Sequence, residues 1–293
     1  MQLHVNSLVS EDSKLLEEQL SGRQLYGESL EYDQIKEWYE QEEAGYFDLV
    51  ENYYGLTDTE FQYDYAYQAL NHFHALGALL RRRFNYCVAL GCAAGYDVAP
   101  LAPVVDRFLA IEPSEKWWRT EIGGKPARYV KPSVLGDIDL EEKAADLVIS
   151  FGVLHHIPNV SHVVAEIARI LRPNGLFAVR EPISWMGDWR RPRPGLTANE
   201  RGLPIQWFDD LAREKGFRII RRRVCMLTPM TIIMKKFGVS RPFASMPITV
   251  LDWLLSELLR WNVHYRRDRF TRKIAPGSAF WLLERRSSND NKL

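Results

Sequence analysis

The chain has 293 residues, enough for one large domain or for a domain with additional segments. Its 38 basic and 38 acidic residues cancel, so no net electrostatic field would attract the chain to nucleic acid. Its three cysteines, Cys87, Cys92 and Cys225, include no Cys-x-x-Cys pair, so the sequence indicates neither a disulfide framework nor a zinc site.

Residues 1–83 predict a helical region that caps the domain after it. Apolar residues recur with helical spacing from Ser13 to Leu20, from Gln34 to Val50 and from Tyr63 to Leu80. The region is rich in tyrosine, which leaves two interpretations: helices that pack on a core with their hydroxyls at the rim, or a lid over an active site. Neither a secretory signal nor an uncharged apolar run of about 18 residues is visible, which favours a cytoplasmic protein.

From Phe84 onward, strand and helix patterns alternate as in an α/β fold. Strands are predicted at 84–90, 108–111, 127–130, 145–151, 176–179, 217–227 and 279–284. Helices are predicted at 96–105, 160–171 and 204–215. Two prolines make the first of these short or irregular, Gly175 suits a left-handed cap after the second, and Gly216 ends the third.

A turn of small residues follows the first of these strands. It reads Gly91-Cys92-Ala93-Ala94-Gly95, and Glu112 closes the next strand. This order of strand, tight turn, helix, strand and acid is typical of the nucleoside-binding half of a Rossmann-like sheet. A dinucleotide fingerprint would need glycine where the chain has Ala93 and Tyr96. The remaining Gly-x-x-x-Gly pattern lets the backbone approach a ligand without holding a diphosphate, and it favours S-adenosylmethionine (SAM) over NAD.

Three blocks, in this order and at this spacing, resemble the class I SAM-dependent methyltransferases. They are ALGCAAGYD (residues 89–97), ADLVISFGVLHHI (145–157) and LRPNGLFAV (171–179). The resemblance implies a Rossmann-like, mostly parallel sheet of seven strands, flanked by helices, whose seventh strand inserts antiparallel beside the fifth. It also implies a methyltransferase domain over residues 84–286, with a helical insertion at about 229–275 and a disordered tail at 287–293.

By the same resemblance, the cofactor is SAM, with no metal ion. Glu112 would accept both ribose hydroxyls, a bidentate charge-assisted contact. Where the family often places an aspartate against the adenine amine, this chain has Ser133, with Asp137 four residues later as a substitute. The cofactor-binding residues implied in this way are Gly91, Cys92, Ala93, Gly95, Glu112, Ser133, Phe151 and Gly152.

Three titratable side chains follow the fourth and fifth strands and are the candidates for catalysis. His155 and His156 are suited to accept a hydroxyl proton, since the histidine pKa lies near about 6.5. Either histidine could instead pack the loop, and only one of two neighbours is expected to reach the acceptor, for which we favour His156. Glu181 could orient a histidine, bind a substrate hydroxyl, or pair with Arg180 or Arg190.

The predicted insertion contains a wide apolar helix at 247–262 followed by a basic cluster at 260–273. A wide apolar face with tryptophans beside basic residues is typical of an interfacial helix on anionic lipid. The favoured alternative is that this helix covers the core or forms a dimer seam. Peripheral membrane contact through 247–273 therefore stays an open interpretation.

These patterns predict a SAM-dependent methyltransferase acting on a small-molecule, glycan-linked or lipid-linked acceptor, most simply at oxygen. A SAM-binding regulatory or partner subunit without catalysis is the alternative, and an NAD-dependent oxidoreductase is the rival enzyme class. Nucleic-acid methylation is disfavoured, because the net charge is zero and no Asn/Asp-Pro-Pro-Tyr/Phe stretch follows the fourth strand.

Overall fold

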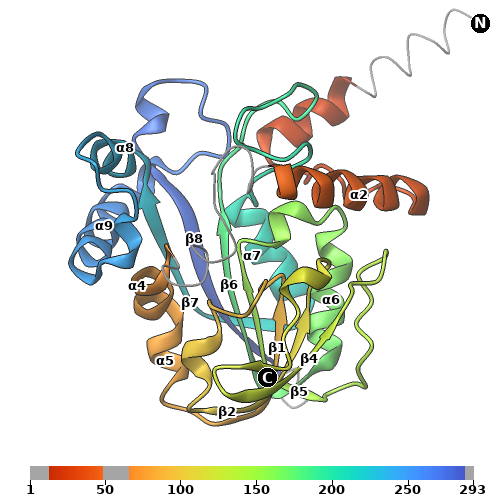
Figure 1. Ribbon diagram of the computed structural model, residues 1–293. Helices are drawn as coiled ribbons and strands as arrows, with labels where there is room; N and C mark the ends of the chain where they lie inside the picture. The colour runs from red at the N-terminus through yellow and green to blue at the C-terminus, as the bar shows by residue number, and fades with distance from the viewer. Residues whose placement is uncertain (1–12, 49–65, 288–293) are drawn as a thin grey trace, which may run out of the picture.

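The computed structural model describes residues 13–48 and 66–287, whose strands form one eight-stranded sheet with helices on both faces (Figure 1). Parts of the predicted helices at 34–50 and 63–80, and the predicted tail beyond Ser287, lie outside these residues. Within the described ranges, no helix is long and apolar enough to cross a lipid bilayer.

The sheet has the strand order β3-β4-β2-β1-β5-β6-β8-β7. Neighbours among β1, β2, β4, β5 and β6 are parallel, whereas β8 lies antiparallel between β6 and β7. All seven predicted strands are present, and the predicted antiparallel insertion of the last strand is confirmed. The eighth strand, β3, is two residues long and pairs antiparallel with β4, too short for a sequence pattern to indicate it. The bounds are β1 Phe84–Leu90, β2 Val105–Ile111, β3 Glu121–Ile122, β4 Lys125–Val130, β5 Ala145–Phe151, β6 Leu171–Pro182, β7 Phe217–Leu227 and β8 Pro276–Arg285.

Helices precede β1 at the N-terminal side of the chain and connect several of the later strands. The longer ones are α2 Tyr32–Asp48, α6 Val160–Ile170, α7 Ile205–Glu214, α8 Thr228–Lys236 and α9 Met246–Leu258. Residues 13–21 are also helical. Short turns are α4 Gln68–Asn71, the π-helix η2 His72–Leu76, α5 Gly77–Leu79 and the 3₁₀ turns η3 Ala99–Leu101, η4 Glu115–Trp117, η5 Leu154–His156, η6 Pro242–Ala244, η7 Arg260–Asn262 and η8 Thr271–Lys273.

Two local predictions need correction. The predicted helix at 96–105 is reduced to the single 3₁₀ turn η3, because Pro100 and Pro103 carry no backbone N–H to continue it. Gly175 does not adopt the left-handed conformation; Asn174 does, with φ 63°. A Cβ on Gly175 would lie 2.8 Å from the carbonyl oxygen of Arg172, so glycine is needed there for close packing.

The core consists of two apolar layers, one on each face of the sheet. Side chains alternate between the layers along β5: Val148 packs with α6 and α7, while Leu147 and Ile149 pack on the opposite side with α4 and α5. Every residue of β5 is buried, as expected for a central parallel strand covered on both faces. This covered sheet fixes the carboxyl ends of its strands, and the candidate site is built on those ends.

Candidate functional site

A cavity of about 680 Å³ lies beyond the carboxyl ends of β1, β2 and β5. This is the place where open α/β sheets bind ligands, and the volume is within the range of small-molecule sites. Gly91 leaves β1 with φ 53°, and its N–H donates to the carbonyl oxygen of Ile111 over 2.8 Å. A Cβ at Gly91 would lie 2.8 Å from the Val153 side chain, so the loop can pass there only as glycine.

Glu112 is a buried carboxylate that faces this cavity. Its Oε2 atom accepts the N–H of Ala93 over 2.9 Å, and its Oε1 atom accepts the N–H of Ser114 over 3.1 Å. Burial raises the pKa of Glu112, although these two hydrogen bonds oppose the shift. The loop after β1 and the acid after β2 are thereby joined at one point.

The cavity brings together most of the predicted cofactor-binding residues. Ser133 lines the cavity together with Asp137, and its hydroxyl accepts the Asp137 N–H over 2.8 Å. Gly95 does not line the cavity; a Cβ there would meet the Ile122 side chain at 2.7 Å, so this glycine packs the loop against β3. The predicted residues on the cavity wall are Gly91, Cys92, Ala93, Glu112, Ser133, Phe151 and Gly152.

Asp97 and Arg180 also line the cavity, although the sequence analysis assigned neither of them a role there. Asp97 is buried, and its Oδ1 atom has no hydrogen-bond partner within the described part of the chain. Burial raises the pKa of Asp97 to about 7, although the charge of Arg180 opposes the shift. Arg180 donates to the Asn71 side chain over 3.0 Å and lies over the Tyr67 ring at 4.4 Å. Asp97 therefore places at the cavity wall a buried acceptor oxygen whose hydrogen-bonding capacity is unused within the described part of the chain.

His156 lines the same cavity and pairs with a carboxylate from α2. Its Nδ1 atom lies 2.6 Å from Oε2 of Glu42. Burial alone would lower the pKa of His156, but the hydrogen bond to Glu42 and the charges of Glu200 and Glu42 outweigh burial and raise it. Burial alone would raise the pKa of Glu42, but its hydrogen bonds and the His156 charge outweigh burial and lower it.

His155 and Glu181 form a second pair behind the cavity wall, and neither lines the cavity. The His155 Nδ1 atom lies 2.7 Å from Oε2 of Glu181, whose Oε1 accepts the N–H groups of Val153 and Leu154. Burial lowers the pKa of His155, and the neighbouring His156 lowers it further. Of the three roles considered for Glu181, the structure supports the orientation of a histidine, and that histidine is His155.

The two arginines considered as partners of Glu181 have other contacts. Arg180 points to Asn71 and Phe151, and Arg190 forms an ion pair with Asp188 at 2.8 Å. Glu181 is fully buried, and its two oxygens are occupied by the histidine and the two backbone N–H groups. The acid at the end of β6 therefore fixes the loop that carries both histidines.

Two further side chains hold this loop in place from other parts of the chain. The Trp38 indole of α2 donates to the His156 carbonyl oxygen over 2.7 Å. The guanidinium of Arg201, fully buried, donates to the carbonyl oxygens of His155 and Pro158, each over 3.0 Å. Three segments thus fix the histidine loop, namely α2, the end of β6 and the segment that carries Arg201, and α2 is part of the site wall.

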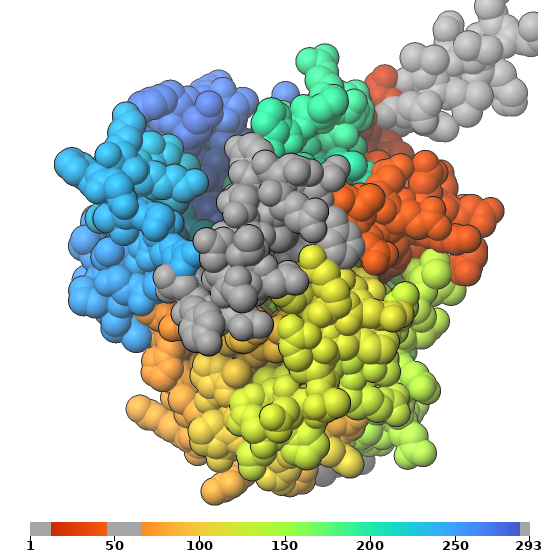
Figure 2. Space-filling view, in the orientation of Figure 1, coloured from red at the N-terminus to blue at the C-terminus, as the bar shows by residue number. Residues whose placement is uncertain are grey.

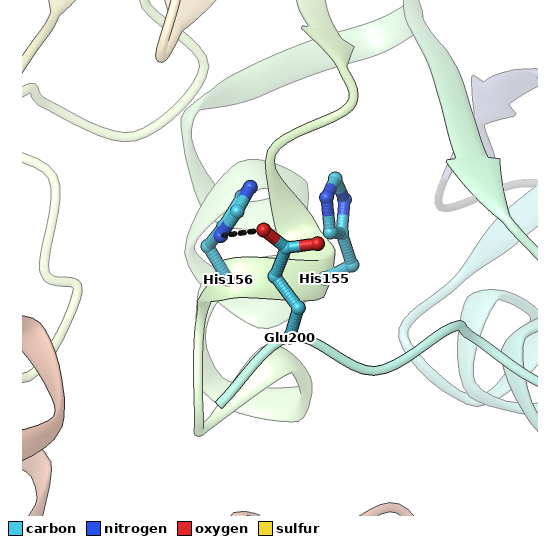
Figure 3. Close-up of side chains that lie close together, drawn as sticks. All are labelled: His155, His156 and Glu200. Carbon is cyan, nitrogen blue, oxygen red and sulfur yellow. Dashed lines mark ion pairs between the residues drawn. The ribbon is translucent and has the colours of Figure 1, made fainter. Parts of the chain in front are cut away.

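His155, His156 and Glu200 are the one group of three potential metal ligands among the described residues (Figure 3). Their ligand atoms lie within 4.8 Å of one another, and His156 Nδ1 is 4.0 Å from Glu200 Oε1. Ligands of one tetrahedral ion with bonds of about 2.1 Å are only about 3.4 Å apart. Both Nδ1 atoms already face carboxylates, so an ion would require Nε2 coordination and a closer approach of all three side chains. The arrangement as it stands is a hydrogen-bonded network.

Glu42, Thr197 and Glu200 belong to this network and were missed by sequence reasoning. Thr197 donates its hydroxyl to Glu42 over 2.5 Å, and its N–H to Glu200 over 3.0 Å. Glu42 lies in an acidic helix with no local motif, and it reaches His156 only through the tertiary fold. Asp97, in contrast, closes the first sequence block, where its place beside the glycine loop was a usable signal.

Comparisons with known proteins find relatives for the part of the chain that carries the three sequence blocks. Residues 88–179 match the family model described as a methyltransferase domain. A protein of Mycolicibacterium smegmatis named "Probable S-adenosylmethionine-dependent methyltransferase" is 29% identical over 133 residues, covering 44% of this chain and 50% of that protein. A protein of the same description from Mycobacterium tuberculosis (strain H37Rv) is 30% identical over 131 residues, covering 43% and 46%. The chain spans about half the length of the curated relatives it matches.

The fold has a counterpart among solved structures. A protein of Galdieria sulphuraria, described as a "putative sarcosine dimethylglycine methyltransferase", superposes with a TM-score of 0.51 at 17% identity. The match covers 74% of this chain and 85% of that chain. Residues 88–179 thus match a methyltransferase domain, as the three sequence blocks predicted, and the relatives that match this chain are named SAM-dependent methyltransferases.

Proposed function

We propose that the protein uses this SAM-dependent methyltransferase domain to transfer a methyl group to a hydroxyl of a small-molecule or carrier-linked acceptor. The observation that carries the proposal is the position of His156, which lines the same cavity as Glu112 while Glu42 holds its Nδ1 atom. Glu112, the candidate cofactor contact, and His156, the candidate base, thus line one cavity.

The cavity residues fit SAM. Glu112 would accept the ribose hydroxyls, and Oδ1 of Asp97, which has no hydrogen-bond partner among the described residues, would accept a hydrogen bond from the α-ammonium group. When bound, SAM supplies a methyl group that is already electrophilic, because it is attached to a sulfonium. The chain therefore has to align the acceptor and remove its proton, and alignment alone can contribute up to roughly 7–11 kcal/mol.

His156 is suited to remove that proton. Because Nδ1 donates to the Glu42 carboxylate, the neutral ring carries its lone pair on Nε2. The acceptor proton would pass to Nε2 as the acceptor oxygen gains the methyl group, and Glu42 would stabilise the resulting imidazolium. A base of this kind contributes on the order of 10²–10⁴-fold. His155, held behind the wall by Glu181, acts in this proposal as a positioning residue.

We propose a cytoplasmic location and acceptors that include small molecules and groups linked to a glycan or lipid carrier. Aromatic and carboxylate side chains from α2, Tyr39 and Glu43 among them, join the cavity wall and would contact such an acceptor. Carboxylates and aromatic faces together suit hydroxyl-rich ligands.

The test is a labelling experiment. Wild-type protein, His156→Ala and the control His264→Ala, which changes an exposed histidine, are each incubated with methyl-labelled SAM and a cell extract. We expect labelled product from the wild type and the control, with turnover lowered about 100-fold or more in His156→Ala at unchanged SAM affinity. Label that stays in alkali-stable ether form supports O-methylation. Equal turnover in all three proteins would contradict the base assignment.

A further inference from the structure

The helix α9 buries three polar side chains and exposes a stripe of leucines, although Ile248 and Leu255 of the same helix pack on the core. Thr249, Asp252 and Ser256 are fully buried. On the opposite stripe, Leu251, Leu254 and Leu258 are 46%, 53% and 70% exposed. A helix that covers a core normally has the reverse arrangement. The predicted packing on the core holds for Ile248, Leu255 and Leu259, whereas the stripe of Leu251, Leu254 and Leu258 faces away from it.

The inverted orientation has a specific cause in the sheet. β7 is the last strand of the sheet, so one side of it has no neighbouring strand to accept its N–H groups. Asp252 accepts the N–H groups of Met226 and Leu227, each over 2.7 Å, and Glu257 accepts that of Val224 over 3.2 Å. Turning α9 over would leave these backbone donors and the two carboxylates without partners, so the apolar stripe must face away from the protein.

The exposed apolar surface extends beyond α9. Of the fourteen large hydrophobic side chains that are exposed within the described ranges, ten lie between Ile232 and Ile274. Phe237, Trp261 and Phe270 are 81%, 75% and 79% exposed. We call this set the flank surface; it comprises Ile232, Ile233, Phe237, Met246, Leu251, Leu254, Leu258, Trp261, Phe270 and Ile274. Residues 232–274, which carry the flank surface, lie together at one side of the molecule (Figure 2).

The charge of this part of the molecule is positive. Residues 228–275 contain nine Lys and Arg residues against three acids. Two of the acids, Asp252 and Glu257, are turned inward to β7, and the third, Asp268, pairs with Arg272 at 2.9 Å. The exposed cations include Lys235, Lys236, Arg260, Arg269 and Lys273. Exposed tryptophan, phenylalanine and leucine beside cations are complementary to the headgroups and acyl boundary of an anionic bilayer.

We propose that the flank surface docks the protein on the surface of a membrane that contains anionic lipids. The apolar stripe of α9 with Trp261 and Phe270 would enter the acyl boundary, while the neighbouring lysines and arginines contact the headgroups. Asn262 ties the end of α9 to the segment that carries Phe270, because its buried side chain donates to the carbonyl oxygens of Thr271 and Ile274 over 2.8 and 2.9 Å.

The flank surface is connected to the cavity wall. Phe243, which precedes α9, stacks on Tyr67 with 6.3 Å between the ring centroids. Tyr67 lines the cavity and lies under Arg180. The segment that precedes α9 is thus one ring contact away from a residue of the cavity wall.

The experiment is co-sedimentation of the full chain with vesicles, without SAM or acceptor, so that it is independent of methyl transfer. Vesicles contain equal parts of phosphatidylglycerol and phosphatidylcholine, or phosphatidylcholine alone, at low and high salt. Leu254→Ser/Leu258→Ser and Lys235→Glu/Lys236→Glu test the flank surface. Leu15→Ser and Arg107→Glu/Arg128→Glu are the matched controls, because they change exposed residues outside the flank surface, the two arginines at the other end of the sheet. SAM affinity of each variant reports that its fold is intact.

We expect binding to anionic vesicles that weakens at high salt. Lys235→Glu/Lys236→Glu should weaken it on the order of 25-fold or more, since each basic residue at such a surface contributes about fivefold. Leu254→Ser/Leu258→Ser should weaken it by at least about tenfold, and the controls by less than about twofold. Absence of binding to anionic vesicles would overturn the proposal. So would a dimer that Leu254→Ser/Leu258→Ser dissociates, because a second copy would then cover the surface.

Discussion

Glu42 and His156, 114 positions apart in the chain, meet with 2.6 Å between a carboxylate oxygen and the imidazole Nδ1 atom. Glu42 also accepts the Thr197 hydroxyl over 2.5 Å and the Asn199 N–H over 2.8 Å, so its position is fixed from two sides. The contact makes α2 part of the chemistry of the site, since it sets the tautomer of His156 and raises its pKa.

Glu42→Gln should therefore change the pH dependence of turnover. The base must be neutral to accept a proton, so turnover rises as the pH increases through the raised pKa of His156. Removing the Glu42 charge lowers that pKa, so the acidic limb of the pH–kcat profile moves to lower pH while the plateau falls by about tenfold or more. Glu37→Gln on the same helix, an exposed position, is the control. An unshifted limb in Glu42→Gln would show that another group controls turnover.

Glu181→Gln should act mainly on stability. Glu181 is fully buried and accepts hydrogen bonds from His155, Val153 and Leu154. The glutamine amide has one acceptor oxygen and one NH₂ group, so its NH₂ group would face the N–H of one of these three partners. We expect a loss of about 2–4 kcal/mol in the free energy of unfolding. Urea unfolding measures the loss, with the exposed Glu141→Gln as the control. A change below about 0.5 kcal/mol would mean that the pair does not hold the loop.

Asp97→Asn should stabilise the ligand-free protein and weaken SAM binding. The pKa of Asp97 is raised from 3.8 to about 7 in the fold, so its ionisation destabilises the native state as the pH rises through this window. Relative to the wild type, the variant should gain little near pH 4 and on the order of 2–4 kcal/mol above pH 7. Urea unfolding at both pH values and calorimetry with SAM measure the two effects. A variant that gains no stability at high pH, or that binds SAM as tightly as the wild type, would contradict the assigned environment.

The parts of the fold that the sequence predicted are those set by local pattern. The apolar runs of β1 and β5, the glycine loop that follows β1 and the acid that follows β2 are each marked by the residues next to them in the chain. The glycine loop can be predicted from the sequence because a tight turn after a buried strand permits few residue types.

The parts that could not be predicted depend on contacts between distant segments. Nothing near Glu42 marks it as the partner of a histidine more than a hundred residues later. The orientation of α9 is a second case: hydrophobicity alone places Leu254 and Leu258 inward, yet the free N–H groups of β7 require Asp252 on the inner side. Hydrogen-bond demand at a sheet edge thus overrides apolar burial, and only the packed structure reveals it.

The most direct test of the account is calorimetric titration of the protein with SAM, with NAD as the comparison ligand and Glu112→Ala as the variant. We predict binding of one SAM per chain, no heat from NAD, and affinity for SAM lowered roughly 10- to 150-fold in Glu112→Ala, as a charge-assisted hydrogen bond of about 1.5–3 kcal/mol implies. Absence of SAM binding to the wild type, or equal affinity of wild type and variant, would contradict the assignment of this cavity.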